Sequence, residues 1–266
     1  MPPRLYVDQT ILGHNTLTLP AAAARHVQVL RLQPGAALTL FNGQGGEWSA
    51  TVLRMGRSDV EVQVTAHSAV EREVPLPVTL ALGMPANERM DALVEKATEL
   101  GVAAIQPLLC ERSVLRLSGE RAEKRITHWR GVAVAACEQS GRTRVPRIAP
   151  VLNLAAWLQA LGSGRDESRL LLSLRGAALL AAAAPAHSSA SLSPQSSKPP
   201  SLPLPALNPG AVLCLSGPEG GLTEAEEAAA KTHGFTAVSL GARVLRADTA
   251  PLALLAHLAL TAENPS

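Results

Sequence analysis

The feature of this sequence that most constrains its fold is a change in hydrophobic period near residue 78. Before this point, Val60–Val64 alternates apolar and polar residues strictly, as a half-buried β-strand does. After it, apolar runs of strand length alternate with segments whose apolar residues recur at helical spacing. In a chain of 266 residues this change predicts two domains, at residues 1–73 and 74–266.

The first domain is predicted to be a small β-barrel with one helix. Strands are expected at 36–41, 47–53 and 60–64, and the short helix at 21–30. Residues 42–46 supply the glycines that a hairpin turn needs between the first two strands. The charged, proline-containing segment 71–77 is predicted to link the two domains.

The second domain is predicted to be a parallel sheet with helices on both faces, because strands and helices alternate along it. Asn87 is expected to cap the first helix, which ends before Gly101, and either Asp248 or Thr249 is expected to cap the last. The expected strands are 78–82, 103–109, 147–148, 170–174, 211–215 and 237–240, and the helices are 87–100, 119–140, 154–161 and 251–260.

Residues 176–209 interrupt this alternation. Alanine, serine and proline dominate the stretch, and Lys198 is its single charged residue. Such a composition cannot bury enough apolar surface to offset the entropy of ordering it. The sequence therefore predicts a flexible surface insertion within the second domain.

Composition also bears on the compartment and on metal binding. The sequence has no apolar run of about 18 residues, and its first residues lack the pattern of a signal peptide, so a cytoplasmic protein without a membrane span is expected. The three cysteines lie far apart in apolar runs, which predicts buried free thiols and no metal cluster.

Basic residues are unevenly distributed. The net charge of the chain is +2, yet residues 110–150 carry nine basic side chains, mostly Arg, against four acidic ones. Clustered arginines suit phosphate binding because the planar guanidinium makes bidentate contacts. For charge clustering alone, a solvated helix face is the better interpretation.

The sharpest local pattern is the glycine-rich segment 215–224. An apolar strand ends there, a turn with three glycines around Glu219 follows, and Thr223 with Glu226 forms a capping box for a helix. Glycines at a helix entry allow a ligand to approach the backbone closely, although a purely structural turn is the alternative. The segment lacks the Walker A and dinucleotide spacings, which argues against nucleoside triphosphate or nicotinamide cofactors.

A second loop, residues 240–250, carries two arginines between a strand and the final helix. Neither Arg243 nor Arg246 is needed for the turn itself, so the pair indicates anion binding.

These segments together resemble the bacterial 16S rRNA uridine N3-methyltransferase family of the SPOUT class. The similar blocks are 26–35, 96–113, 137–146, 217–223 and 240–250, and Asp248 stands where the family more often has Glu. The resemblance implies a trefoil-knotted α/β domain with a parallel sheet, preceded by a PUA-like β-barrel. It also implies a homodimer with its active site at the subunit interface, and 16S rRNA in the small ribosomal subunit as partner.

The implied cofactor is S-adenosyl-L-methionine, held by backbone groups of the knot loops. An adenine ring needs an apolar slot with a few main-chain hydrogen bonds, which leucines and glycines provide. The residues expected there are Leu172, Leu215, Gly217, Glu219, Gly220, Gly221, Leu240, Gly241 and Leu245. For Glu219, fixing the backbone at a helix N-terminus is the favoured role.

Methylation of uridine N3 requires loss of an imide proton and stabilisation of the anion that results. Positioning and electrostatics should supply most of the acceleration. Arg112, Arg142 and Arg246 are candidates to stabilise this anion, and Glu138 is a candidate proton acceptor. An ion pair at a helix end is nearly as well supported for Glu138 and Arg142.

RNA contacts are expected from Arg4, His26 and Arg31, together with Arg112 and Arg142. For His26 a structural role is favoured, and Arg4 and Arg31 are also consistent with plain surface charges. A ribose 2′-O-methyltransferase of the same class and a non-catalytic RNA-binding assembly factor are the alternative functions.

Overall fold

The structure is a computed structural model that describes residues 2–57, 59–162, 166–173, 175, 178–179 and 210–263. The predicted insertion at 176–209 therefore lies outside the described residues, except for Ala178–Leu179. These two residues form the short strand β11.

The N-terminal domain is a mixed five-stranded sheet that packs on one helix. Its strands are β1 (Arg4–Tyr6), β2 (Thr16–Thr18), β3 (Ala37–Phe41), β4 (Glu47–Met55) and β5 (Val60–Ser68), in the order β1-β3-β4-β5-β2. β1 runs parallel to β3, and the remaining pairs are antiparallel. Ala23, Ala24 and Val27 of α1 (Ala21–Val29) pack into the core of this sheet. The predicted hairpin and helix are confirmed, whereas β1 and β2 were not expected.

The second domain contains one parallel sheet, as predicted. Its strands follow the order β11-β13-β10-β12-β6-β7-β8, with β9 also paired to β7, and every pairing is parallel. The new elements are β6 (Val78–Gly83), β7 (Ala104–Leu109), β8 (Arg147–Ile148), β9 (Leu152–Asn153), β10 (Glu167–Leu172), β12 (Ala211–Ser216) and β13 (Thr236–Ser239).

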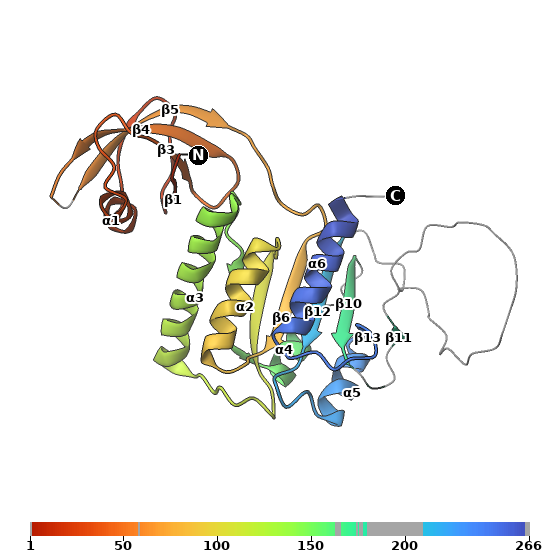
Figure 1. Ribbon diagram of the computed structural model, residues 1–266. Coiled ribbons are helices and arrows are strands. Elements are labelled where there is room, and N and C mark those ends of the chain that lie inside the picture. Colours follow the sequence, from red (N-terminus) through yellow and green to blue (C-terminus); the bar gives the residue numbers. More distant parts are fainter. Residues whose placement is uncertain are drawn as a thin grey trace, which may run out of the picture.

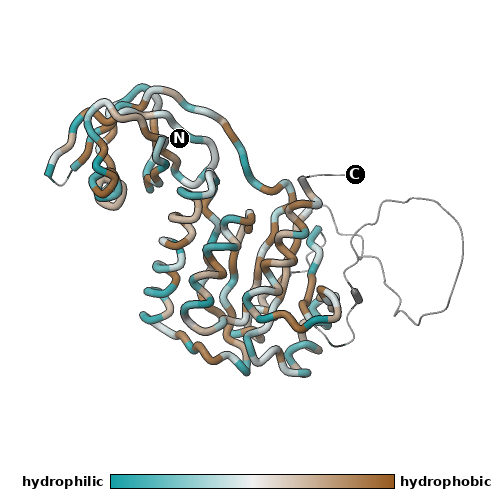
Figure 2. Tube along the Cα trace, viewed as in Figure 1, coloured by the Kyte–Doolittle hydropathy of each residue, from teal (hydrophilic) through white to brown (hydrophobic). Residues whose placement is uncertain are grey.

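Helices cover both faces of this sheet, and the strand sequences explain how. Val212 and Cys214 of β12 face a core with α2 (Asn87–Glu99), α3 (Gly119–Ser140) and α6 (Thr249–Glu263). Leu213 and Leu215 face the opposite core, with α4 (Leu154–Ala160) and α5 (Glu224–Thr232). Alternate residues of a strand point to opposite faces, so a continuous apolar run serves both layers. Figure 2 shows these strands and α6 as predominantly hydrophobic.

Two predicted helix starts need correction. Asn87 is the first residue of α2, and the residue at the cap position is Ala86, which makes no side-chain cap bond. The last helix begins at Thr249, two residues earlier than expected. The capping box of α5 is confirmed, with Thr223 and Glu226 hydrogen-bonded reciprocally.

The ends of α2 mark two opposite edges of the molecule. Its thirteen residues make it about 20 Å long. Ala86 at its start lies at the carboxyl edge of the sheet, and Thr98 near its end lies at the amino edge, where α3 also ends (Figure 1). The N-terminal domain sits beyond this amino edge, beside the end of α3. None of the described helices is long and apolar enough to cross a membrane.

Candidate functional site

A pocket of about 480 Å³ opens at the carboxyl edge of the sheet. The last residues of three strands line it, Leu172 of β10, Ser216 of β12 and Ser239 of β13. In parallel α/β sheets, ligands bind at this edge, and a pocket of this volume suits a small-molecule cofactor.

The glycine-rich turn forms one wall of this pocket, as predicted. A β-carbon on Gly217 would lie 2.9 Å from the amide nitrogen of Leu222, and one on Gly220 would lie 3.0 Å from Cβ of Arg112. Gly221 has φ +67°, a conformation that residues with side chains rarely adopt. The sequence of this turn therefore follows from a tightly folded backbone.

Carboxylates connect this turn to two neighbouring loops. Oε1 of Glu219 accepts a hydrogen bond of 2.9 Å from the amide of Ala86, at the start of α2. This contact matches the backbone-fixing role that was favoured for Glu219. Glu226 accepts from the amide of Thr223 at 2.9 Å and from the amide of Glu111 at 2.8 Å. Glu226 thus holds the loop after β7 against the helix that follows the glycine turn.

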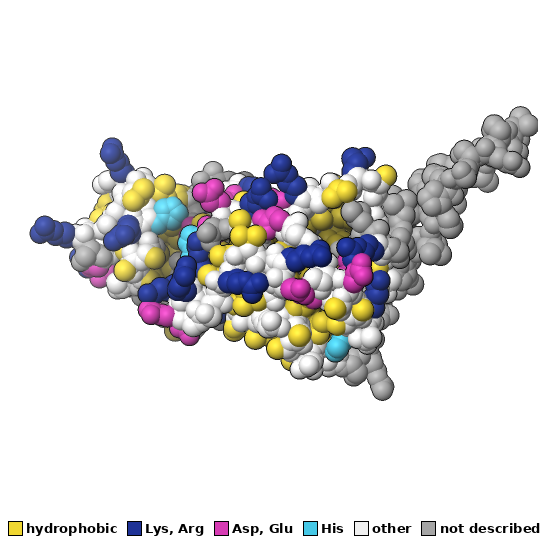
Figure 3. Space-filling model, turned by 90° about the horizontal axis from the view of Figure 1, so that it is seen from below, with side chains coloured by type: hydrophobic (Ala, Val, Ile, Leu, Met, Phe, Trp, Pro, Cys, Tyr) yellow, Lys and Arg dark blue, Asp and Glu magenta, His cyan; other side chains and the backbone are white. Residues whose placement is uncertain are grey.

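Five arginines line the pocket, and they differ in whether their side chains have a partner within the chain. Three are engaged within the chain: Arg89 with Glu219, Arg112 with the carbonyl of Gly220 at 3.1 Å, and Arg175 with Glu224. The side chains of Arg243 and Arg246 have no hydrogen-bond or ion-pair partner within the described residues. Figure 3 views this end of the molecule and shows basic side chains interspersed with acidic ones. The two free guanidinium groups remain available to an anionic ligand.

Most of the residues expected at the cofactor are at this pocket. Leu172, Gly217, Glu219, Gly220, Gly221, Leu240 and Leu245 line it. Leu215 is fully buried in the sheet beneath, and Gly241 (φ +112°) is not among the lining residues.

The four expected catalytic residues are separated into two groups. Arg112 and Arg246 line the pocket. Arg142 lies at the opposite end of α2, where its Nη1 donates to the carbonyl of Thr98 at 2.8 Å. Glu138 accepts from the amide of Tyr6 at 2.9 Å, at the junction with the N-terminal domain. Within a single chain, Arg142 and Glu138 therefore lie away from the pocket, and their catalytic role stays a prediction.

The helix-end ion pair between Glu138 and Arg142 is not formed either. Arg142 is 4% exposed and instead pairs with Glu73 of the linker through both Nε and Nη2. Periodicity gave no sign of this pairing, because the two residues are 69 positions apart.

The three residues of the N-terminal domain that are expected to bind RNA differ in burial and in their partners. The guanidinium of Arg4 pairs with Glu47 and is largely buried. Nδ1 of His26 lies 3.5 Å from Glu138. Arg31 is exposed and its side chain has no partner within the described residues. Of these three, only Arg31 presents an unoccupied charge to solvent.

The three cysteines are buried free thiols, as predicted. Burial raises the pKa of Cys110, Cys137 and Cys214 to about 12. They are therefore protonated and unreactive at neutral pH.

Comparison with known proteins identifies the family. The RNA methyltransferase domain family matches residues 72–259. The chain belongs to this family. An RNA methyltransferase PUA domain matches residues 19–65, which run from just after β2 through α1 into β5.

Relatives of this RNA methyltransferase span nearly the whole chain. It is 32% identical over 256 residues to ribosomal RNA small subunit methyltransferase E of Synechocystis, covering 96% of this chain and 76% of that protein. It is 30% identical over 250 residues to the protein of the same name from Bacillus subtilis, covering 93% and 91%. A crystal structure of ribosomal RNA small subunit methyltransferase E from Neisseria gonorrhoeae, bound to S-adenosyl methionine, matches with a TM-score of 0.82 at 36% identity, covering 96% of each chain.

The predicted fold class is confirmed by these matches. The methyltransferase has an N-terminal PUA domain followed by a knotted α/β domain with a parallel sheet. Arg243, for which the 240–250 loop predicted anion binding without a cofactor or catalytic role, also lines the pocket.

Proposed function

We propose that this protein transfers a methyl group from S-adenosyl-L-methionine to N3 of a uridine in 16S rRNA. The observation that carries the proposal is the pocket at the carboxyl edge, which is built from the glycine turn and the 240–250 loop. Both segments belong to the blocks that resemble the uridine N3-methyltransferases, and the relatives named above are small-subunit rRNA methyltransferases.

The pocket residues fit this cofactor. Leu172, Leu240 and Leu245 offer an apolar wall for an adenine ring. Gly217 and Gly220 let the turn beside it fold tightly against Leu222 and Arg112. When bound, S-adenosyl-L-methionine supplies an electrophilic methyl group. Glu219 and Glu226 contribute indirectly, because their bonds to backbone amides fix the loops that form the pocket.

Arg246 is proposed to stabilise the uracil anion. Its guanidinium is at the pocket and has no partner within the described residues, so no internal contact must break when a ligand binds. Arg112 is proposed to act beside it while holding the carbonyl of Gly220. Arg243 is added as a further candidate for RNA phosphate binding, with Arg31, which lies in the turn after α1 of the N-terminal domain.

We also propose a cytoplasmic homodimer. Val244 is 80% exposed at the pocket, and Val114 is 76% exposed on the loop after β7. Large exposed apolar side chains at a functional edge are typical of surfaces that another chain covers.

The decisive experiment combines binding and product analysis. Calorimetry should detect binding of S-adenosyl-L-methionine to the purified protein. Small-subunit rRNA from a strain lacking the gene, incubated with protein and cofactor, should gain 3-methyluridine by mass spectrometry. A gain of 2′-O-methyluridine instead would assign the ribose chemistry, and RNA binding without any methylation would assign an assembly factor.

A further inference from the structure

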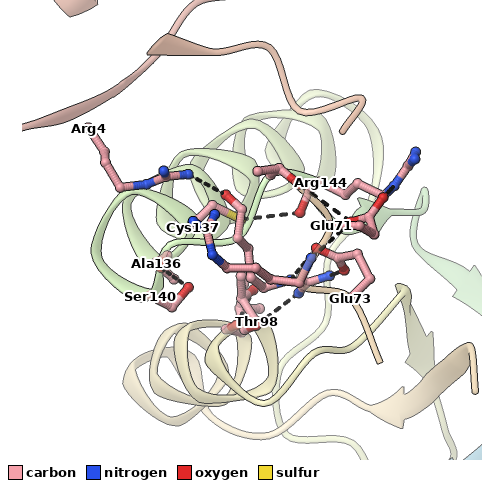
Figure 4. Close-up of polar contacts among 12 residues, drawn as sticks. Arg4, Glu71, Glu73, Thr98, Ala136, Cys137, Ser140 and Arg144 are labelled. Carbon is pink, nitrogen blue, oxygen red and sulfur yellow. Dashed lines mark hydrogen bonds and ion pairs between the residues drawn. The ribbon is translucent and has the colours of Figure 1, made fainter. Parts of the chain in front are cut away.

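The segment Glu138–Arg144 makes most of the polar contacts between the two domains. It comprises the last three residues of α3 and the loop that follows, and it is far from the pocket, so the proposed chemistry leaves it without a role. Its side chains and carbonyls contact three pieces of the N-terminal half: β1, the turn between β3 and β4, and the linker. Figure 4 shows the contacts to Arg4 of β1 and to Glu71 and Glu73 of the linker. We call these contacts the junction network.

The linker is held by two ion pairs. Arg142 pairs with Glu73, and their side chains are only 5% and 17% exposed. Nε of Arg144 donates to Glu71 at 2.8 Å in a more exposed pair. Nη1 of Arg142 also donates to the carbonyl of Thr98, which ties the linker to the end of α2.

β1 and the linker are also connected through Glu47. Its carboxylate pairs with Arg4 of β1 and with Arg72 of the linker, and these two arginines donate to the carbonyls of Arg142 and Gly141. Glu138 completes the contact to β1 by accepting from the amide of Tyr6.

The turn between β3 and β4 packs directly on the same segment. The amide of Gly45 donates to the carbonyl of Thr143 at 3.1 Å, and the amide of Val145 donates to the carbonyl of Gly43 at 3.2 Å. A β-carbon on Gly45 would lie 2.7 Å from the guanidinium of Arg144. The glycines of this turn thus serve the junction as well as the hairpin.

Because β1, the β3–β4 turn and the linker all contact this one short segment, the contacts fix the orientation of the N-terminal domain as well as its attachment. A flexible linker alone would leave the domains free to reorient, which is the usual expectation for a small polar interface. The carboxylates and guanidinium groups here each make several hydrogen bonds. Such contacts are directional and restrict the motion of one domain relative to the other.

We propose that the junction network fixes the N-terminal domain for RNA binding and thereby sets the affinity for rRNA without taking part in methyl transfer. Glu138, Arg142 and Arg144 are then positioning residues. This inference rests on the proposed function only in naming rRNA as the substrate whose binding depends on the orientation.

The test uses the exposed pair, because the protein should fold without it. Arg144→Glu places a carboxylate against Glu71, and the charge-swapped protein with Arg144→Glu and Glu71→Arg restores an ion pair. The single variant should raise KM for small-subunit rRNA about tenfold, equivalent to about 1.4 kcal/mol, and the swap should recover most of it. The kcat and the affinity for S-adenosyl-L-methionine should stay within twofold of the parent.

A second measurement reports orientation without any RNA. Cysteines introduced as Leu53→Cys on β4 and Lys124→Cys on α3 take spin labels selectively, because the native thiols are buried. The distance distribution between the labels should be narrow in the parent, broad with Arg144→Glu and narrow again in the swap. This result stands even if the protein proves not to methylate RNA, so failure of the proposed function remains distinguishable.

Two outcomes would overturn the inference. One is an unchanged distance distribution together with an unchanged KM for rRNA in the single variant. The other is a fall in kcat at unchanged KM, which would mean that the segment acts in the chemical step.

Glu138 provides a matched pair of variants. Glu138→Gln keeps an oxygen acceptor for the amide of Tyr6, whereas Glu138→Ala removes it. The alanine variant should raise KM for rRNA several-fold and the glutamine variant should remain close to the parent. Equal losses in both would point to the charge of Glu138, and away from a positioning contact.

Discussion

At the scale of single residues, Gly217 is where the pocket depends most directly on the absence of a side chain. A β-carbon there would lie 2.9 Å from the amide nitrogen of Leu222 and 3.1 Å from the carbonyl carbon of Gly221. Both neighbours are backbone atoms of the same turn, so relief requires the turn itself to move. The shape of the pocket and the identity of this residue are therefore coupled.

Gly217→Ala should weaken binding of S-adenosyl-L-methionine at least tenfold in calorimetry, because the turn must change its conformation to accommodate the alanine side chain. Gly131→Ala is the matched control, since a β-carbon at Gly131 of α3 meets nothing within 4 Å. That control should leave cofactor binding unchanged and raise stability by up to about 1 kcal/mol, the helix-propensity difference. Normal cofactor binding by Gly217→Ala would show that the turn is not part of the site.

Arg142 and Arg246 should give opposite results when each is replaced by alanine. Arg142→Ala leaves the part-buried carboxylate of Glu73 unpaired, and losing one partner of a buried pair costs about 3 kcal/mol or more. The side chain of Arg246 has no polar partner within the described residues, so the melting temperature of Arg246→Ala should match that of the parent.

For the rate of methyl transfer, Arg246→Ala should be the more damaged of the two variants. Loss of an electrostatic contact made in the transition state costs roughly 2.7–4 kcal/mol, so Arg246→Ala should lose at least a hundredfold in single-turnover methyl transfer. Thermal unfolding and single-turnover rates measured on both variants check the pair. A stable Arg142→Ala protein without methyl transfer would return Arg142 to the catalytic group.

At the scale of elements, the helices were more predictable than the strands of the N-terminal sheet. Helix α3 was expected at Gly119–Ser140 and is found there, because its apolar residues recur over six turns and glycines flank it. β1 and β2 have three residues each, too few for any period, and β1 exists because it pairs with β3 more than thirty residues later. Such strands are defined by long-range pairing that no local pattern records.

The site divides in the same way. Leucines and glycines in the two loop blocks reach the pocket because each block follows directly from a strand that ends there. The place of Arg142 depends instead on Glu73 in the linker and on the carbonyl of Thr98, both distant in sequence. Local motifs predicted the pocket, whereas tertiary pairing decided which arginines face it.

Substitution of Glu226 tests whether hydrogen bonds between the loops at the carboxyl edge stabilise the pocket. Glu226→Ala frees the amides of Thr223 and Glu111, whereas Thr223→Ala removes only the cap hydroxyl, a loss of about 1 kcal/mol. Glu226→Ala should therefore lower the melting temperature more than Thr223→Ala and should also weaken cofactor binding. Differential scanning calorimetry with and without S-adenosyl-L-methionine checks this, and equal effects of the two variants would contradict it.

At the scale of the whole molecule, the junction network makes domain orientation sensitive to acid. Hydrogen bonds from Arg72, and then those from Arg4, hold the pKa of Glu47 below its ordinary value of 4.5 despite desolvation. A carboxyl whose pKa is lowered by folding stabilises the native arrangement above the ordinary value. That contribution is lost as the pH falls through the lowered pKa.

The distribution of distances between the spin labels on β4 and α3 should therefore stay narrow from pH 7 to pH 5 and broaden below about pH 4.5. Glu47→Gln should show a broader distribution already at pH 7, because the carboxylate that joins Arg4 to Arg72 is gone. A distribution that does not change down to pH 3 would mean that Glu47 has no part in orienting the domains.

The proposed dimer gives the last prediction. Val244 lies between Arg243 and Leu245 on a pocket loop, and its side chain is 80% exposed although a valine gains free energy when water is excluded from it. A partner chain that covers this edge would remove that exposure, and a carboxylate buried there without a partner would be strongly unfavourable. Val244→Glu should therefore shift sedimentation velocity from dimer toward monomer at micromolar protein. Leu12→Glu is the control, because Leu12 is 60% exposed on the N-terminal domain, away from the pocket, and the variant should sediment as the parent does. A parent protein that sediments as a monomer at every concentration would remove the dimer from the proposal and leave Val244 as a side chain that contacts only RNA or solvent.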